Sequence, residues 1–352
     1  MIALATTSIG WLIVAIIAIG YVGYYILNNK SARDELGSEI ELAPNRKPYY
    51  DDDTLETKRL DRVLGMGVVL LAIIVVILPV YWILEPSRQA GAQEAKEEIF
   101  VEWGAGLFAP TADGGFNCAG CHGATGGGGV AAYNVTDPGT GEVRAVNWIA
   151  PALNTIFYRF SEDEVRFILV YGRPFSPMSP WGVEGGGPMN DQQIDTLIAY
   201  LHSIQIERED CGEGEDDPRT CPSGHLPTAE QEAIEAAARQ AMDDGEAASY
   251  GEALFNLELA SGAYSCARCH TPGWSWGEPG VSGQGALGPN LTGGRAATQF
   301  PNESDMIDFI KNGSVLGAKY GIQGQGSGRM PGFGSMLTDE QVRAIVEYVR
   351  SL

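Results

Sequence analysis

Two short stretches, Cys118-Ala-Gly-Cys-His122 and Cys266-Ala-Arg-Cys-His270, place the same pattern at two distant points of the sequence. In a Cys-x-x-Cys-His run, two thiols can add to the vinyl groups of one porphyrin, and the histidine that follows can ligate the iron. A Cys-x-x-Cys pair can also form half of a zinc site or a redox dithiol. A dithiol does not need the histidine. Two zinc sites would have to share the remaining candidate ligands, which are Cys211, Cys221, His202 and His225.

The repeated pattern therefore predicts two covalently bound haems c. The predicted attachment points are Cys118 and Cys121 in the first motif, and Cys266 and Cys269 in the second. The iron ligands that these motifs supply directly are His122 and His270.

The first hundred residues contain two apolar runs, at about 9–27 and 63–84, each long enough to cross a bilayer as a helix. A signal peptide is the alternative for the first run, but no Lys or Arg precedes Lys30 to form a positive n-region. Lys and Arg gather in the loop 28–62, which predicts that this loop is cytoplasmic. We therefore expect a two-pass protein of the plasma membrane with its haem domains on the outer face, where haem c is attached.

Length and charge limit the remaining possibilities. The 352 residues allow two or three domains. A formal net charge of −22 argues against binding to nucleic acid and suits a partner with a basic docking face. We expect four parts: a membrane anchor at 1–94, a haem domain at 95–205, an acidic linker at 206–225, and a second haem domain at 226–352.

The linker holds the remaining cysteines, Cys211 and Cys221, around a short charged loop without an apolar anchor. Outside the membrane a disulfide between them is the natural inference, and two free thiols are the alternative. Residues 227–242 are rich in Ala, Glu and Gln and predict a helix. The tract Gly126–Gly129 is interpreted as a flexible loop rather than a phosphate cradle, because no strand–GxxxxGK–helix context surrounds it.

The two haem regions share an order of elements. Each has a Gly-x-x-Leu-Phe helix, the haem motif, a Pro-x-Leu segment, a middle helix, a methionine-containing turn and a closing helix with a polar cap. The matching segments are 104–108 and 251–255, 151–153 and 289–291, and 177–182 and 329–334. Predicted helix caps are Ser161–Glu164, Asn190–Gln193 and Thr338–Gln341.

Each region resembles a class I cytochrome c domain, and together they cover about 95–352. Together with the two apolar runs, the resemblance leads us to expect a mostly α-helical protein, with two N-terminal transmembrane helices followed by two tandem class I cytochrome c domains. It also implies a second axial ligand, a carbonyl that fixes the histidine tautomer and a packing aromatic in each domain. By matching motif these are Met178, Pro151 and Tyr200 in the first domain, and Met330, Pro289 and Tyr348 in the second.

Other residues could compete for these roles. Met189 and Met336 each precede a closing helix, and their spacing favours packing in the core over ligation. His202 lies on a closing helix and His225 in the acidic linker, where surface or packing roles are expected. A thioether ligand favours ferrous iron, and two filled axial positions suit electron transfer.

The resemblance extends to two kinds of respiratory subunit. One is the dihaem cytochrome c subunit of actinobacterial-type cytochrome bc complexes, which implies transfer of electrons from a quinol-oxidising complex to a terminal oxidase. Its neighbours would be cytochrome b, an iron–sulfur protein and cytochrome oxidase, in one supercomplex within the lipid bilayer. The other is the dihaem subunit of C-family haem-copper oxidases, in which two spans also precede two haem domains. Both are electron-transfer subunits, so no catalytic residue is predicted.

Two further hypotheses lie outside these complexes. A dihaem enzyme, such as a peroxidase or a sulfur-compound dehydrogenase, would need an open or exchangeable position on one iron, which the paired methionine motifs argue against. A membrane-tethered carrier acting alone is the other alternative.

Overall fold

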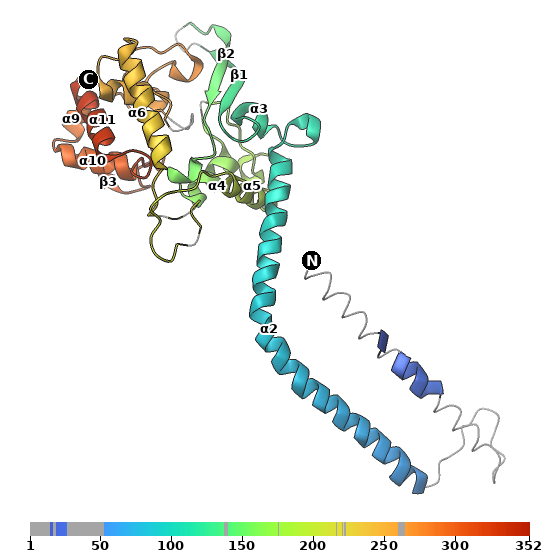
Figure 1. The fold of residues 1–352 in the computed structure, drawn as a ribbon. Helices are drawn as coiled ribbons and strands as arrows, with labels where there is room; N and C mark the ends of the chain where they lie inside the picture. The colour runs from blue at the N-terminus through green and yellow to red at the C-terminus, as the bar shows by residue number, and fades with distance from the viewer. Residues whose placement is uncertain are drawn as a thin grey trace. The chain divides into compact units, whose positions relative to one another are not determined.

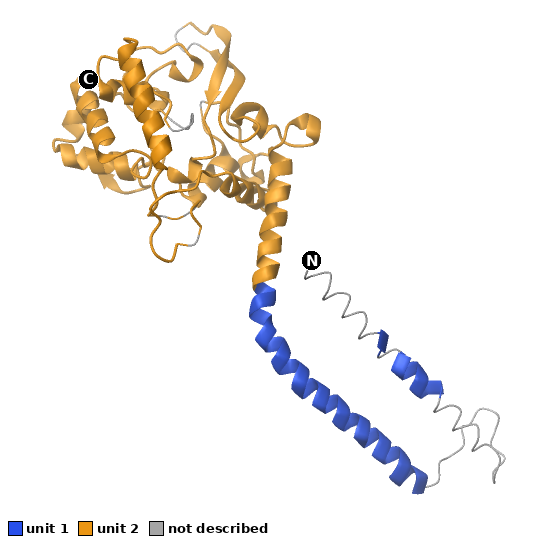
Figure 2. Cartoon of the chain, viewed as in Figure 1, with its two compact units in different colours: residues 1–89 blue, residues 90–352 orange. Residues whose placement is uncertain are grey.

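The computed structural model describes residues 15–16, 19–26, 53–136, 140–174, 176–215, 217–219, 221, 223–259 and 265–352. The chain divides into two compact units, Met1–Gln89 and Ala90–Leu352, which are coloured separately in Figure 2. Both predicted haem motifs belong to the second unit. The finer boundaries at 94, 205 and 225 stay predictions.

The second predicted span lies within the helix α2 (Leu60–Phe108), which directly follows the π-helical η1 (Thr54–Arg59) (Figure 1). Over Thr54–Phe108 the most apolar 18-residue window has a mean hydropathy of 3.1, and none of it is buried. By length and composition this is the one helix among the described residues that could cross a membrane.

The first predicted span and its loop fall mostly outside the described residues. Of the run 9–27, residues 15–16 and 19–26 are described and helical, and nearly all of them are exposed. Of the loop 28–62, residues 28–52 lie outside the description. The two-pass topology therefore stays a prediction.

The described residues of the first haem region form several helices and a two-stranded sheet. Its elements after α2 are η2 (Thr111–Asp113), α3 (Cys118–His122), β1 (Gly129–Thr136), β2 (Val143–Ala150), η3 (Ile156–Tyr158), α4 (Glu162–Tyr171), η4 (Val183–Gly185) and α5 (Asp191–Ser203). The predicted capping boxes at Ser161 and Asn190 are confirmed at the starts of α4 and α5. In each box, the side chain of the N-cap residue accepts from the backbone N–H three residues later, and the side chain of that later residue accepts from the N-cap N–H. These two bonds fix where the helix begins.

The second haem region repeats the order of first helix, haem motif, middle helix and closing helix, but its strand pair follows the middle helix instead of preceding it. Its elements are α6 (Thr228–Asp243), α7 (Tyr250–Asn256), α8 (Ala267–His270), η5 (Trp274–Trp276), α9 (Arg295–Gln299), α10 (Glu303–Asn312), β3 (Lys319–Tyr320), β4 (Gly324–Gln325) and α11 (Asp339–Ser351). The predicted linker helix is confirmed as α6, and the capping box at Thr338 begins α11.

A glycine lets the first and last helices of each haem region cross closely. A Cβ placed on Gly104 of α2 would overlap the Thr196 carbonyl of α5, and one on Gly251 of α7 would overlap the Ala344 carbonyl of α11. The predicted aromatic contact lies beside each crossing. The ring centroids of Phe108 and Tyr200 are 5.1 Å apart, and those of Phe255 and Tyr348 are 5.4 Å apart.

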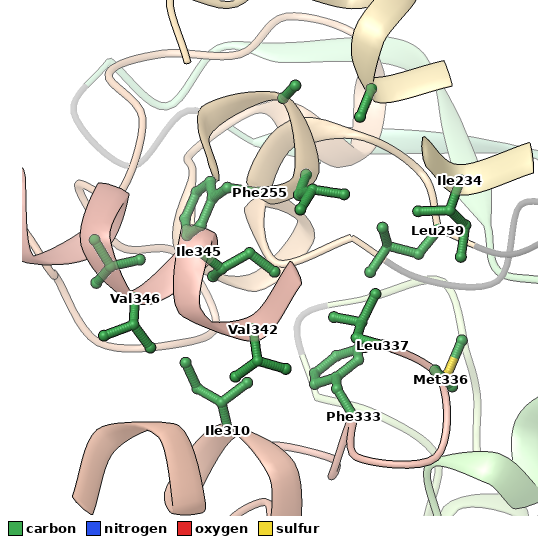
Figure 3. Packing of buried hydrophobic residues seen from close by; sticks show 14 of the residues in the cluster. Ile234, Phe255, Leu259, Ile310, Phe333, Met336, Leu337, Val342, Ile345 and Val346 are labelled. Atoms are coloured by element: carbon green, nitrogen blue, oxygen red, sulfur yellow. The ribbon is translucent and has the colours of Figure 1, made fainter. Parts of the chain in front are cut away.

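Each haem region has its own apolar core. In the second, the apolar positions of α11 are buried against α7 and α10, as Figure 3 shows for Val342, Ile345, Phe255 and Ile310. This core also includes Ala152 and Tyr158 from the first haem region. The Ser335 hydroxyl donates to the Tyr158 carbonyl at 2.9 Å. The two haem regions are therefore packed against one another within the second unit.

The glycine-rich segment after the first haem motif is a loop over Gly126–Gly128, as expected, but its backbone is hydrogen-bonded to neighbouring segments and it leads into a strand that we did not expect. The amide of Gly128 donates to the His122 carbonyl, and the Gly126 carbonyl accepts from Leu153. From Gly129 the chain enters β1, which pairs antiparallel with β2 over eight residues. Valine and aromatic residues in both strands favour this hairpin. The sequence analysis did not predict it, because the preceding glycines are typical of a loop.

The linker is held to the protein more firmly than its acidic sequence indicates. Cys211 and Cys221 form a disulfide, with Cα atoms 5.7 Å apart. Arg208 is buried, donates to the carbonyls of Cys221 and Phe157, and lies 4.3 Å from the centroid of the Tyr158 ring. Arg208, which precedes the disulfide loop, therefore fixes the linker to the first haem region.

The glycine crossing leads to a test on α2. Gly104→Ala should lower the free energy of unfolding by about 1–3 kcal/mol, because the methyl group must displace backbone of α5. Gly106→Ala is the matched control, since no atom lies within 4 Å of the added Cβ, and it should stabilise by about 0.5–1 kcal/mol. Chemical unfolding followed by circular dichroism measures both. Equal effects of the two substitutions would contradict the crossing.

The linker disulfide leads to a second test. Replacing Cys211 and Cys221 together by serine should lower the free energy of unfolding by about 2–3 kcal/mol, because a constraint on the unfolded chain is lost. A mild reductant should lower the stability of the wild-type protein by a similar amount and leave the double variant unchanged. A wild-type protein that is indifferent to reductant would show that the bond does not stabilise the fold.

Candidate haem sites

The first motif lies on α3, a single short turn of helix preceded by Asn117 in the left-handed conformation, with φ of 65°. Its histidine is fixed from behind, because Nδ1 of His122 lies 2.8 Å from the Pro151 carbonyl oxygen. A carbonyl can only accept, so Nδ1 carries the proton and donates it to this bond. Nε2 is left as the nitrogen able to ligate a metal.

The second motif repeats this arrangement. Nδ1 of His270 lies 2.9 Å from the Pro289 carbonyl oxygen, and the residue is 9% exposed. Gly288 packs against the imidazole, where a Cβ would lie 2.7 Å from Cε1 of the ring. Because real side chains do not come so close, the chain needs a glycine beside this histidine. The first motif has no such glycine, and His122 is half-buried.

Burial sets the protonation of both motifs. It lowers the pKa of His122 and of His270, with a further lowering of the His122 pKa by the charge of Arg268, while the proline carbonyls act in the opposite direction. Both rings are therefore neutral at pH 7, which is the form that binds iron. Burial also raises the pKa of Cys118 to about 11 and that of Cys266 to about 12.

None of the four motif cysteines is in a disulfide, so their sulfur atoms stay available for thioether bonds. Two thiols three positions apart, followed by a neutral imidazole with an oriented Nε2, suit covalent haem attachment at each site. Cys118, Cys121 and His122 would hold one group, and Cys266, Cys269 and His270 the other.

The methionine turns are built alike. Gly172 and Gly313 end the middle helices with φ of 69° and 72°. Their chains then bond to the methionine segments, because the Arg173 amide donates to the Met178 carbonyl and the Ser314 amide to the Met330 carbonyl, each at 2.9 Å. Both methionine side chains are half-buried.

The competing residues lie elsewhere. Met189 and Met336 are each 0% exposed, so their expected place in the core is confirmed. His202 stacks on Phe157 with ring centroids 3.7 Å apart, and His225 is an exposed residue paired through its backbone with Glu209. Ligation by Met178 and Met330 stays a prediction.

Sequence reasoning missed two residues beside the second motif. Gly288 directly precedes the Pro-x-Leu segment, which is a signal that could have been used, although Ala150 stands at the matching position of the first site. Arg268 occupies a variable position inside the motif and turns out to be buried. No local sequence pattern indicates that this arginine is buried.

Two family models match the chain, one over each haem region. A model described as cytochrome c matches residues 101–205, and a model described as cytochrome c oxidase, cbb3-type, subunit III matches residues 247–349. No curated protein and no solved structure matches the chain. Each matched segment contains one attachment motif with its carbonyl-bonded histidine. The chain is therefore a multi-haem c-type cytochrome of class I, with two cytochrome c domains that indicate covalently bound haem c.

Proposed function

We propose that this protein is a membrane-tethered electron relay that carries two haems c on the outer face of the plasma membrane. One observation carries the proposal: both domains combine a histidine fixed through Nδ1 with a half-buried methionine turn. A haem c held by histidine and methionine supplies a one-electron change between ferrous and ferric iron, with no transfer of atoms. The protein's residues hold each haem, exclude other ligands and orient the imidazole.

The membrane tether is supported by α2, whose run 63–84 is apolar and exposed along its length. The outer location is supported by the basic residues of the predicted loop 28–62 and by the site of haem c attachment. A net charge of −22 suits brief docking with a basic partner, because charge complementarity speeds encounter and orients it.

We assign the relay to a quinol-oxidising cytochrome bc complex, from which it would pass electrons to a terminal cytochrome oxidase. The order along the sequence, in which two haem domains follow an apolar helix, supports this assignment through its resemblance to the dihaem subunit of such complexes. The expected neighbours are cytochrome b, an iron–sulfur protein and cytochrome oxidase.

A second candidate is the dihaem electron-entry subunit of a C-family haem-copper oxidase. One specific observation favours it, which is the match of residues 247–349 to subunit III of a cbb3-type oxidase. A dihaem enzyme such as a peroxidase is the weaker alternative, because it needs an exchangeable iron ligand and each domain offers a methionine turn instead.

The ligand assignment can be tested at the second site. Met330→Leu should lower the reduction potential of one haem and allow the reduced protein to bind carbon monoxide, because a soft ligand is lost and a coordination position opens. Met336→Leu is the control, a volume-conserving change in the core that should cost less than about 1.5 kcal/mol and leave both potentials unchanged.

Redox titration and carbon monoxide difference spectra measure these effects. If Met330→Leu titrates like the wild type while Met336→Leu binds carbon monoxide, the ligand is Met336. Carbon monoxide binding by the reduced wild-type protein would favour the enzyme.

The assignment to a complex can be tested by mild-detergent purification through a tag on this chain, followed by mass spectrometry. Cytochrome b and an iron–sulfur protein among the co-purifying proteins would support the bc-complex assignment, and oxidase subunits beside them would indicate a supercomplex. A haem-copper subunit without cytochrome b would favour the C-family oxidase. A protein that purifies alone would contradict both assignments and leave a tethered carrier.

A further inference from the structure

Arg268 lies between the two cysteines of the second haem motif, yet it faces away from them. Cys266 and Cys269 are three residues apart and share one side of the helical turn, so the residue at 268 projects elsewhere. Its side chain is 7% exposed, which is unusual for an arginine. The matching position in the first motif is Gly120, which has no side chain and is exposed. The two sites therefore differ at this point.

The guanidinium group of Arg268 contacts both haem domains. Nη1 donates to the Ile149 carbonyl, at the end of β2 in the first domain. Nη2 donates to Oε1 of Glu258 in the second domain at 2.7 Å, and the group lies 5.0 Å from the centroid of the Trp274 ring. A planar guanidinium can satisfy these partners at fixed angles, which an ammonium cannot do equally well.

The strand that Arg268 contacts leads directly to the first haem site. Two residues after Ile149 comes Pro151, whose carbonyl accepts the proton of Nδ1 on His122. The connection from Arg268 to His122 therefore consists of two hydrogen bonds and the backbone of three residues.

Aromatic and ionic contacts hold the same pair of segments together. Trp148 of β2 packs on Trp276 of η5 with ring centroids 5.2 Å apart, and Tyr133 of β1 packs edge-on against Trp148. Arg144 and Glu278 form an ion pair at 2.6 Å, with both side chains about half exposed. The hairpin β1–β2 is thus the surface of the first domain that receives the second haem motif.

We propose that Arg268 is an interdomain positioning residue, which fixes the second haem motif against the strand leading to Pro151 and raises the reduction potential of the first haem, toward whose domain its buried positive charge is directed. This inference rests on the proposed relay function. A positive charge held out of water favours the reduced form of a nearby centre, because reduction removes one positive charge. Glu258, one-third exposed, offsets only part of that charge.

The test uses redox titration of the purified holoprotein and amide hydrogen exchange. Arg268→Gln should lower the reduction potential of one haem by about 59 mV. At a fixed solution potential, this raises the ratio of oxidised to reduced haem about tenfold for a one-electron change. It should also speed exchange in the β1–β2 hairpin, because a contact that holds the hairpin is lost. Arg268→Lys keeps the charge and should shift the ratio less than about threefold.

Two further variants keep the test decisive. Arg144→Gln removes the exposed interdomain ion pair and should leave both potentials unchanged, because water screens that charge. Glu258→Gln removes the opposing charge without removing Arg268, so it should raise the potential, and it remains informative if Arg268→Gln fails to fold. Wild-type potentials in both Arg268→Gln and Glu258→Gln would overturn the inference, as would unchanged exchange in the hairpin. A wild-type protein that titrates as a single haem would instead overturn the proposed dihaem relay.

Discussion

The hydrogen bond from a histidine Nδ1 to a proline carbonyl is the constraint on which both haem sites depend. It forces a short helical turn to lie against a segment 19 residues away in the second site and 29 residues away in the first. The chain between the histidine and the proline must therefore fold back on itself, and its glycines supply the turns that this requires. The close crossing of the first and last helices then joins the two ends of each domain.

The two sites reach the same histidine geometry by different routes. In the second, a short glycine-rich loop returns directly, and Gly288 leaves room for the imidazole. In the first, the returning chain is extended by the hairpin β1–β2, and no glycine presses on His122. The extension also forms an interdomain contact, because its second strand, β2, contacts Trp276 and Arg268 of the second domain.

What the sequence could predict was local or repeated. A haem motif spans five residues and a capping box four, so each can be recognised without knowledge of the fold. The resemblance to class I cytochrome c domains, matched motif by motif, also located Pro151, Pro289, Tyr200 and Tyr348. The buried roles of Arg208 and Arg268 could not be predicted, because each depends on partners in distant segments. The hairpin was missed for a different reason, since strand-forming residues followed a glycine tract that is typical of loops.

The contact between the two domains bears directly on how such a protein could work. Electron transfer between two centres depends steeply on their separation, so a relay gains from domains held in one fixed relation. Apolar contacts alone, such as Trp148 on Trp276, would permit small rotations, because dispersion forces have little directionality. A guanidinium bonded at once to a backbone carbonyl of one domain and a carboxylate of the other restricts those rotations. The cost of burying that charge is then offset by its hydrogen bonds, while the charge itself acts on His122 in the haem site of the other domain.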